Sequence, residues 1–164
     1  MKVGGFLITD MLLSVLLVYF LLMNVTVERF YCHGKLVHGD SRFLVKETID
    51  FCRDNNPLFL QRPEWLAKAT CLSAYVLSLG YLFLLYVVSS NGWKKFAVPL
   101  LLFLGAKAYA IGFYHLMEFT SDLPPKNLIP YFSVEGPYIL SMAIVLSKVV
   151  YALNGKEGVV KKEK

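Results

Sequence analysis

The sequence has few of the residues that hold metal ions, because only three of its 164 residues are cysteines and three are histidines. Cys32, Cys52 and Cys71 lack the paired Cys-x-x-Cys spacing of a zinc site. Cys32 with His33 and His38 would offer three ligands, but no second pair completes a set of four. We therefore expect no metal ion and no cofactor.

Charged residues are also scarce, since they make up 18% of the chain and hydrophobic residues make up 56%. An ordinary soluble domain averages about 45 to 50% apolar residues. The hydrophobic residues gather in four runs, roughly 5–28, 66–89, 96–118 and 132–153. Each run reaches the length of about 20 residues that a helix needs to span hydrocarbon. The sequence therefore predicts an all-α membrane protein, a four-transmembrane-helix bundle forming one domain over 1–164 and ending in a basic tail, 154–164.

The net charge of +5 would suggest a nucleic-acid partner in a soluble protein. Here lysine and arginine lie mainly in loops and in the tail, where they act as topology signals, so we expect no nucleic acid. With four spans, Lys2, Lys94, Lys95 and the tail fall on one side, which favours cytosolic termini. Lys161 and Lys162 begin a Lys-Lys-x-x ending, a pattern typical of retrieval to the endoplasmic reticulum. The alternatives are a tail that contacts anionic lipid head groups and residence in another internal membrane.

The first loop, of about 35 residues, carries signals of its own. Cys32 and Cys52 share this non-cytosolic loop, which makes a disulfide between them a candidate, whereas Cys71 lies in the second span. Over 41–53, apolar residues recur at near-helical spacing among charged residues. This pattern predicts a short amphipathic helix on the membrane surface or over the end of the bundle. Trp65 is interpreted as an interface anchor or as part of a cavity mouth.

Ionisable residues inside the spans indicate where a site lies, because each costs about 2.5 to 3.5 kcal/mol on insertion scales. They are Asp10, Lys107, Glu118 and Glu135, with Glu28 at the edge. Lys107 is near the middle of the third span, so it should face the bundle interior and meet an acid or water there, and Asp10 is the first candidate acid. Such a pair could be structural or reactive.

Two further groupings follow from helix geometry. Four residues of the third span recur at spacings of four, three and four and so share one face, which should point inward: Lys107, Ile111, Tyr114 and Glu118. Glu28, Glu118 and Glu135 should approach each other at the membrane boundary opposite the termini. They could hold a cation or share a proton there, or each could simply meet water at the interface.

Several motifs together carry a resemblance to a known family. They are Asp10 and Glu28 near the two ends of the first span, Asn56-Pro57-Leu58 followed by Pro63-x-Trp65, Trp93-Lys94 before Pro99, and Pro137-Tyr138 in the fourth span. In order and spacing the chain resembles the EXPERA family, which contains the emopamil-binding sterol isomerase and the sigma-2 receptor. The resemblance covers nearly the whole chain and is closest to the sigma-2 receptor branch.

The resemblance implies a bundle in the endoplasmic reticulum whose pocket, open sideways to lipid, takes sterol-like or amine-bearing amphiphiles. The candidate ligand-binding residues are Glu28, Asn56, Trp65, Ser73, Lys107, Tyr114, Glu118, Glu135 and Tyr138. Asn56 and Ser73 stand where that branch carries acids, and Glu135 stands where it carries an aromatic, so Glu135 could supply the missing carboxylate. Glu28 and Glu135 would bind an amine or hydroxyl, Tyr138 would form an aromatic wall, and Asn56 would cap the pocket.

The same comparison argues against an enzyme. The isomerase branch uses a histidine and a glutamate one helical turn apart in its second span, and residues 66–89 contain no His, Asp or Glu. Because proton transfer needs an acid and a base within reach of the substrate, we predict a non-catalytic binding protein rather than a sterol isomerase.

The alternative is a structural or assembly subunit of a larger membrane complex, whereas a homodimer would be compatible with the binding protein. Small residues that permit close helix approach favour the assembly subunit, namely Gly80, Gly105, Ala106, Ala108, Ala110 and Gly112.

Overall fold

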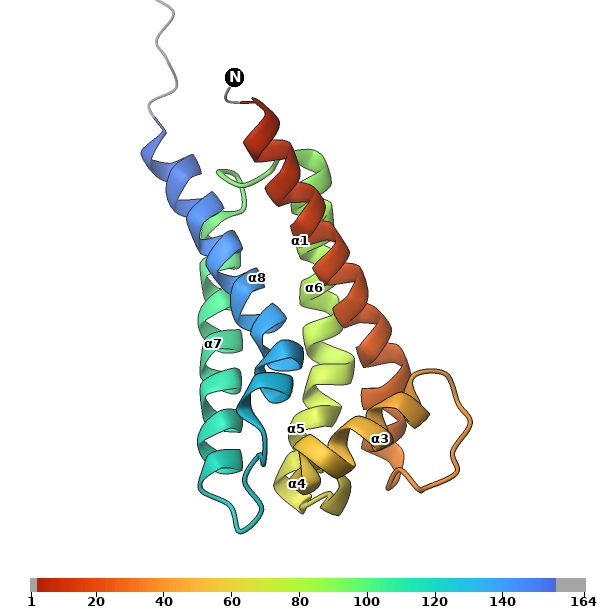
Figure 1. Ribbon diagram of the computed structural model, residues 1–164. Coiled ribbons are helices and arrows are strands. Elements are labelled where there is room, and N and C mark those ends of the chain that lie inside the picture. The colour runs from red at the N-terminus through yellow and green to blue at the C-terminus, as the bar shows by residue number, and fades with distance from the viewer. Residues whose placement is uncertain (1–2, 156–164) are drawn as a thin grey trace, which may run out of the picture.

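A computed structural model describes residues 3–155 and shows an all-α bundle built on four long helical rods (Figure 1). Four helices are long and apolar enough to cross a membrane: Ile8–His33, Glu64–Ser90, Ala97–Phe119 and Leu128–Asn154. The described residues contain no strand. The chain is therefore a multi-pass membrane protein, and the fold class predicted from the sequence is confirmed.

Two of the rods have three parts. The first consists of α1 (Val3–Met23), the π-helical turn η1 (Asn24–Glu28) and α2 (Arg29–His33). The second consists of α5 (Glu64–Leu72), the π-helical turn η2 (Ser73–Leu77) and α6 (Ser78–Ser90). The third and fourth rods are α7 (Ala97–Phe119) and α8 (Leu128–Asn154). The first span ends at His33 instead of near Glu28. The charged residues Glu28 and Arg29 lie inside the helix and do not end it.

The rods pack as neighbours in sequence and across the bundle. Helix α1 packs against α6 and α8, and α7 packs against α8. Helix α1 begins and α8 ends at the same end of the bundle, as an even number of spans requires (Figure 1). The side on which this end lies stays a prediction. Lys2 and the retrieval lysines Lys161 and Lys162 lie outside the described residues.

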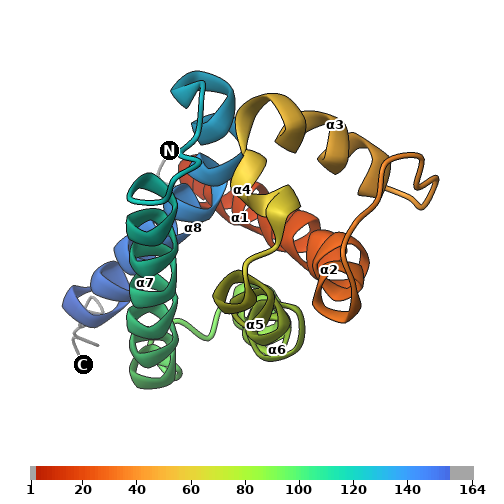
Figure 2. The same cartoon turned by 90° about the horizontal axis from the view of Figure 1, so that it is seen from below.

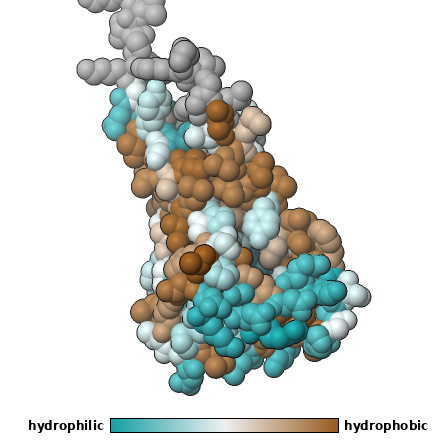
Figure 3. Space-filling model, viewed as in Figure 1, coloured by the Kyte–Doolittle hydropathy of each residue, from teal (hydrophilic) through white to brown (hydrophobic). Residues whose placement is uncertain are grey.

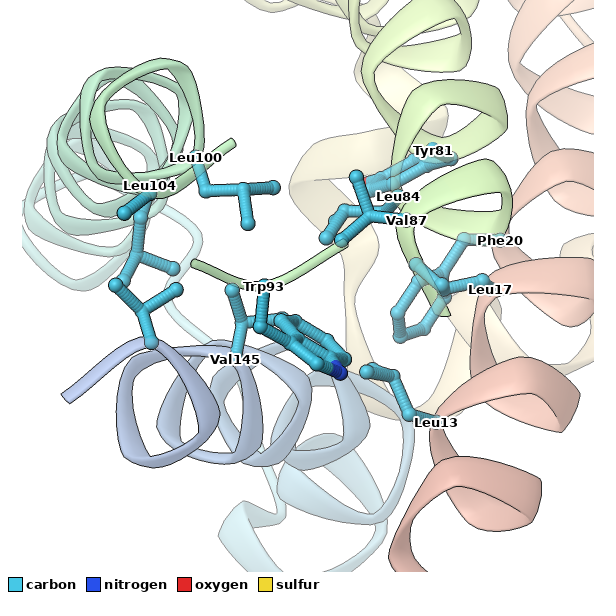
Figure 4. Packing of buried hydrophobic residues seen from close by; sticks show 12 residues of the cluster. Leu13, Leu17, Phe20, Tyr81, Leu84, Val87, Trp93, Leu100, Leu104 and Val145 are labelled. Carbon is cyan, nitrogen blue, oxygen red and sulfur yellow. The ribbon is translucent and has the colours of Figure 1, made fainter. Parts of the chain in front are cut away.

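The buried core lies toward this terminal end. Its members come from all four rods and from the α6–α7 loop, and include Leu13, Leu17, Phe20, Tyr81, Leu84, Val87, Trp93, Leu100, Leu104, Val145 and Val149. Trp93 lies between Leu13 of α1 and Val145 of α8 (Figure 4). The loop thus supplies a large side chain that fills the space between helix pairs, and the apolar residues left outside form the lipid-facing surface.

The opposite end is covered by the first loop. It holds α3 (Val45–Asn55) and α4 (Pro57–Gln61), which lie across this end (Figure 2). Hydrophilic residues gather here, whereas hydrophobic residues cover the shaft of the bundle (Figure 3). Val45, Ile49 and Cys52 form the buried stripe of α3. The predicted amphipathic segment is confirmed, although it begins at Val45 because Leu44 has a left-handed φ of 63°.

The disulfide differs from the candidate pair. Cys32 of α2 is bonded to Cys71 of α5, with their Cα atoms 4.8 Å apart, and Cys52 is free. The reason is that α2 packs directly along α5, whereas α3 turns Cys52 into its buried face. The candidate pairing of Cys32 with Cys52 was wrong.

We expect Cys52 to resist thiol reagents in the folded protein. Burial, with the nearby Glu118 carboxyl as a second cause, raises the pKa of the Cys52 thiol to about 12, and the thiolate is the reactive form. Intact-mass analysis after maleimide treatment should show no adduct on native protein, one after denaturation, and three after denaturation with reduction. An adduct on Cys52 in native protein would contradict this packing.

Candidate functional site

The two π-helical turns lie side by side and are joined by a buried asparagine. η1 and η2 are in contact, and the fully buried Asn24 donates from Nδ2 to the Ser73 carbonyl at 3.0 Å and to Ser78 Oγ at 3.0 Å. A π turn disturbs the regular backbone ladder, and such turns are frequent at functional sites. Here the disturbed segments of two spans meet inside the bundle.

Glu28 ends η1 beside this junction. It is half-buried, and its carboxylate interacts with the hydroxyl of Ser73 in η2. Its Oε2 atom is buried and has no hydrogen-bond partner within residues 3–155. Buried polar atoms nearly always have a hydrogen-bond partner. This carboxylate oxygen can therefore accept a hydrogen bond from another molecule.

Glu135 and Tyr138 come from α8, on either side of Pro137. Glu135 is half-buried and close enough to Glu118 and to Glu28 to interact electrostatically with each of them. Their grouping is looser than a metal site, because no three His, Cys, Asp or Glu side chains in the described part of the chain are placed to hold a metal ion. Tyr138 stacks on Phe20 of α1 with ring centroids 4.1 Å apart.

Lys107 lies inside the bundle with 2% of its surface exposed. Its Nζ donates to Ser141 Oγ at 3.2 Å. The ammonium also faces three aromatic rings, with centroids at 4.8 Å for Phe20, 4.7 Å for Tyr81 and 5.5 Å for Tyr138. Lys107 and Glu28 interact electrostatically.

The predicted pair of Lys107 with Asp10 was wrong, because Asp10 Oδ1 pairs with Lys148 Nζ at 2.6 Å. Depth in the membrane explains the difference. At 1.5 Å per residue, Asp10 lies about 10 Å along α1 and Lys148 about 9 Å before the end of α8, whereas Lys107 lies about 15 Å along α7. The pair therefore joins α1 to α8 near the terminal end, away from Lys107.

Glu118 is the centre of a second polar group. It is fully buried; its Oε1 accepts from Asn56 Nδ2 and from Tyr114 OH, the latter at 2.6 Å, and its Oε2 accepts from Tyr131 OH. Asn56 also caps α4, because its Oδ1 accepts from the Phe59 N–H at 3.3 Å. Both carboxylate oxygens of Glu118 are thus occupied by the protein itself.

The inward face predicted for the third span is confirmed, since Lys107 and Glu118 are buried and Ile111 and Tyr114 are half-buried. The predicted site nevertheless divides into two groups. Glu28, Ser73, Lys107, Glu135 and Tyr138 form an inner polar group. Asn56, Tyr114 and Glu118, together with Tyr131, form the Glu118 network.

Trp65 belongs to neither group. It lies near the start of α5, is half-buried, and meets Phe113 of α7 edge to face at 6.2 Å between centroids. This position favours the interface-anchor interpretation, because α5 begins at the loop-covered end of the bundle.

Sequence reasoning missed several contributors. They are Asn24, Phe20, Tyr81, Tyr131 and Ser141. Asn24 and Ser141 are polar residues within apolar runs, which was a usable signal. The aromatic residues gave no such signal, because aromatic residues are spread through every span of this chain.

Fold and site together define an all-α, four-span membrane protein with two groups of polar side chains buried between its helices. No protein-family model, no curated protein and no solved structure matches the chain. The resemblance to the EXPERA family accordingly stays a prediction from sequence motifs.

Proposed function

We propose that this protein is a non-catalytic binding protein for sterol-like or amine-bearing amphiphiles, of the EXPERA type and closest to its sigma-2 receptor branch. The observation that carries the proposal is the Glu28 carboxylate, which lies between the spans with Oε2 buried and without a partner among the described residues. Glu135 supplies a second carboxyl within electrostatic reach.

The surroundings of these carboxyls suit an amphiphile. Ionisable groups inside a membrane are costly and are retained mainly where they serve a function. Small-molecule sites combine apolar and aromatic walls with a few polar groups that fix the orientation of the ligand. The inner polar group has this composition, with the stacked rings of Tyr138 and Phe20 beside Glu28 and Glu135. The carboxyls would bind the amine or hydroxyl, and the rings would contact the apolar body.

A binding role fits better than isomerisation of a sterol. Residues 66–89, which include η2 and all but the last residue of α6, contain no His, Asp or Glu. The polar groups that η2 offers at this junction belong to Ser73, a hydroxyl and a carbonyl already engaged by Glu28 and Asn24. Neither is an acid or base suited to moving a proton on a sterol ring.

For the location we propose the endoplasmic reticulum membrane with both termini in the cytosol. The disulfide between Cys32 and Cys71 joins α2 to α5, the parts of the first two spans that adjoin the first loop, and disulfides persist in oxidising compartments. A lumenal first loop would thus accompany a cytosolic tail, where Lys161 and Lys162 would be accessible to retrieval machinery.

The test is binding of a tritiated sterol and of a tritiated amphiphilic tertiary amine by purified protein in lipid nanodiscs. Glu28→Gln should lower the amine affinity by about tenfold or more, because it removes a charge-assisted hydrogen bond in a poorly solvated site. Glu47→Gln on the exposed face of α3 is the matched control and should bind as wild type does. Equal binding by wild type and Glu28→Gln would remove the role given to Glu28.

A second candidate, an assembly subunit, is favoured by one observation. Gly105, Ala108 and Gly112 lie exposed on α7, and a Cβ added at Gly105 or Gly112 would meet no atom within 4 Å. Gly80 differs, because an added Cβ would lie 2.0 Å from the ring of Phe103, so it serves the internal approach of α6 and α7. Native mass spectrometry in mild detergent separates the two functions, since a stable large partner supports assembly and bound lipid on a monomer or homodimer supports the receptor.

A further inference from the structure

Three spans build an aromatic cage, and the remaining span fills it. Phe20 of α1, Tyr81 of α6 and Tyr138 of α8 surround the ammonium of Lys107 from α7, with centroids 4.7 to 5.5 Å from Nζ. Phe20 and Tyr81 reach inward from their helices in Figure 4. Rings arranged in this way attract organic cations through their negative faces. The occupant here is part of the protein.

The cage, and no ion pair, holds this cation. A lysine ammonium has three N–H donors, and the Ser141 hydroxyl is its one hydrogen-bond acceptor within residues 3–155. No carboxylate of those residues lies within ion-pair distance of Lys107. The other buried lysine, Lys148, is held differently, by Asp10 at 2.6 Å. Movement of Lys107 out of the cage would therefore break no salt bridge.

The cage and the candidate ligand carboxyls share one space. Glu28 interacts electrostatically with Lys107. Glu28 and Glu135 both lie close to the cage residues Tyr81 and Tyr138. A ligand amine drawn toward Glu28 would thus approach rings that already bind an ammonium, and two like charges at such a distance in a poorly solvated region repel each other.

We propose that Lys107 is a tethered competitor for cationic ligands, which makes the inner polar group select neutral sterol-like alcohols over the corresponding amines. This inference rests on the proposed function and names its ligand class. A hydroxyl can accept a hydrogen bond from Nζ and donate one to Glu28, so a neutral alcohol uses both groups. An amine can only donate when protonated, and it must displace Lys107 from the cage.

The experiment compares two tritiated ligands with one ring system, a 3-hydroxysterol and the matching 3-aminosterol, on full-length protein in nanodiscs. Lys107→Met removes the charge and keeps an apolar side chain of similar length. It should raise the aminosterol affinity by about tenfold, the scale of a desolvated cation–π contact, and leave the hydroxysterol affinity equal or lower. Lys107→Arg keeps a cation and should keep the wild-type preference.

Control variants distinguish a failure of the competitor role of Lys107 from a failure of the proposed function. The double variant Asp10→Asn with Lys148→Met removes a buried lysine outside the cage and should keep the wild-type ratio of the two affinities. Lys107→Gln is measured alongside and has the same expected direction, so the result does not depend on one variant folding. An unchanged or lowered aminosterol affinity in the uncharged variants overturns the competitor role while sterol binding stands. Binding of neither sterol by wild type or variants overturns the proposed function and, with it, this inference.

Discussion

Replacing Glu118 with alanine is expected to destabilise the folded protein by about 3 kcal/mol or more. The carboxylate is fully buried and accepts from Asn56, Tyr114 and Tyr131. Its removal takes an acceptor from three side chains, two of which keep another partner, because Asn56 Nδ2 also donates to Tyr114 OH and Tyr131 OH also bonds with His115 Nδ1. Each buried polar group left unsatisfied costs about 1 to 3 kcal/mol, and the space left by the side chain adds to this. The network joins the first loop to α7 and α8, so the loss should be felt across the loop-covered end.

Thermal unfolding of purified protein in detergent measures this effect. For a chain of this length a loss of 3 kcal/mol lowers the midpoint by about 6 to 12 °C. Glu47→Ala on the exposed face of α3 is the matched control and should leave the midpoint unchanged. A midpoint of Glu118→Ala equal to that of wild type would show that Asn56 and the two tyrosines do not depend on this carboxylate.

The parts of this molecule that were predictable from its sequence depend on simple periodicities. Four runs of about 20 apolar residues gave four spans, because hydrocarbon requires every backbone group to be paired within a helix. The inward face of α7 followed from the spacing of Lys107, Tyr114 and Glu118, because residues three and four apart lie on one side of a helix. The approach of Glu135 to Glu118 and to Glu28 followed from the alternating direction of the spans.

The remaining features depend on three-dimensional packing. Nothing in the residues 24–28 or 73–77 distinguishes a π turn from ordinary helix, so the junction through Asn24 was not foreseen. The disulfide depends on α2 lying along α5, which loop length alone does not determine. The predicted partner of Lys107 was wrong because Asp10 lies at a depth in the membrane only roughly similar to that of Lys107. The depth of Lys148 is closer to that of Asp10.

Breaking the ion pair between Asp10 and Lys148 is expected to cost about 2 to 3 kcal/mol. The side chain of Lys148 is 5% exposed and that of Asp10 is 20% exposed, so Asp10→Asn leaves an ammonium in a poorly solvated place. Removing one partner of a fully buried pair costs about 3 to 5 kcal/mol, and the partial exposure of Asp10 lowers that figure. The double variant Asp10→Asn with Lys148→Met should recover most of the loss, because the buried ammonium is removed together with its carboxylate partner.

The same unfolding assay, carried out as a double-mutant cycle, isolates the interaction between the two side chains. Glu64→Gln provides the comparison, since it breaks the exposed pair of Glu64 with Lys68, which should contribute little. Strictly additive losses from the two single substitutions would show that the pair does not couple α1 to α8.

The two π turns also set the rotational phase of the spans that contain them. One residue more than an α-helical turn rotates everything that follows by about 100°. In the first span η1 separates Phe20, which faces the core, from Cys32, which faces α5; in the second, η2 separates Cys71 from Tyr81. Both rods gain the same extra rotation about their axes where η1 and η2 are in contact, so the two rotations match. The cysteines can therefore meet on one side of the junction while Phe20 and Tyr81 meet on the other.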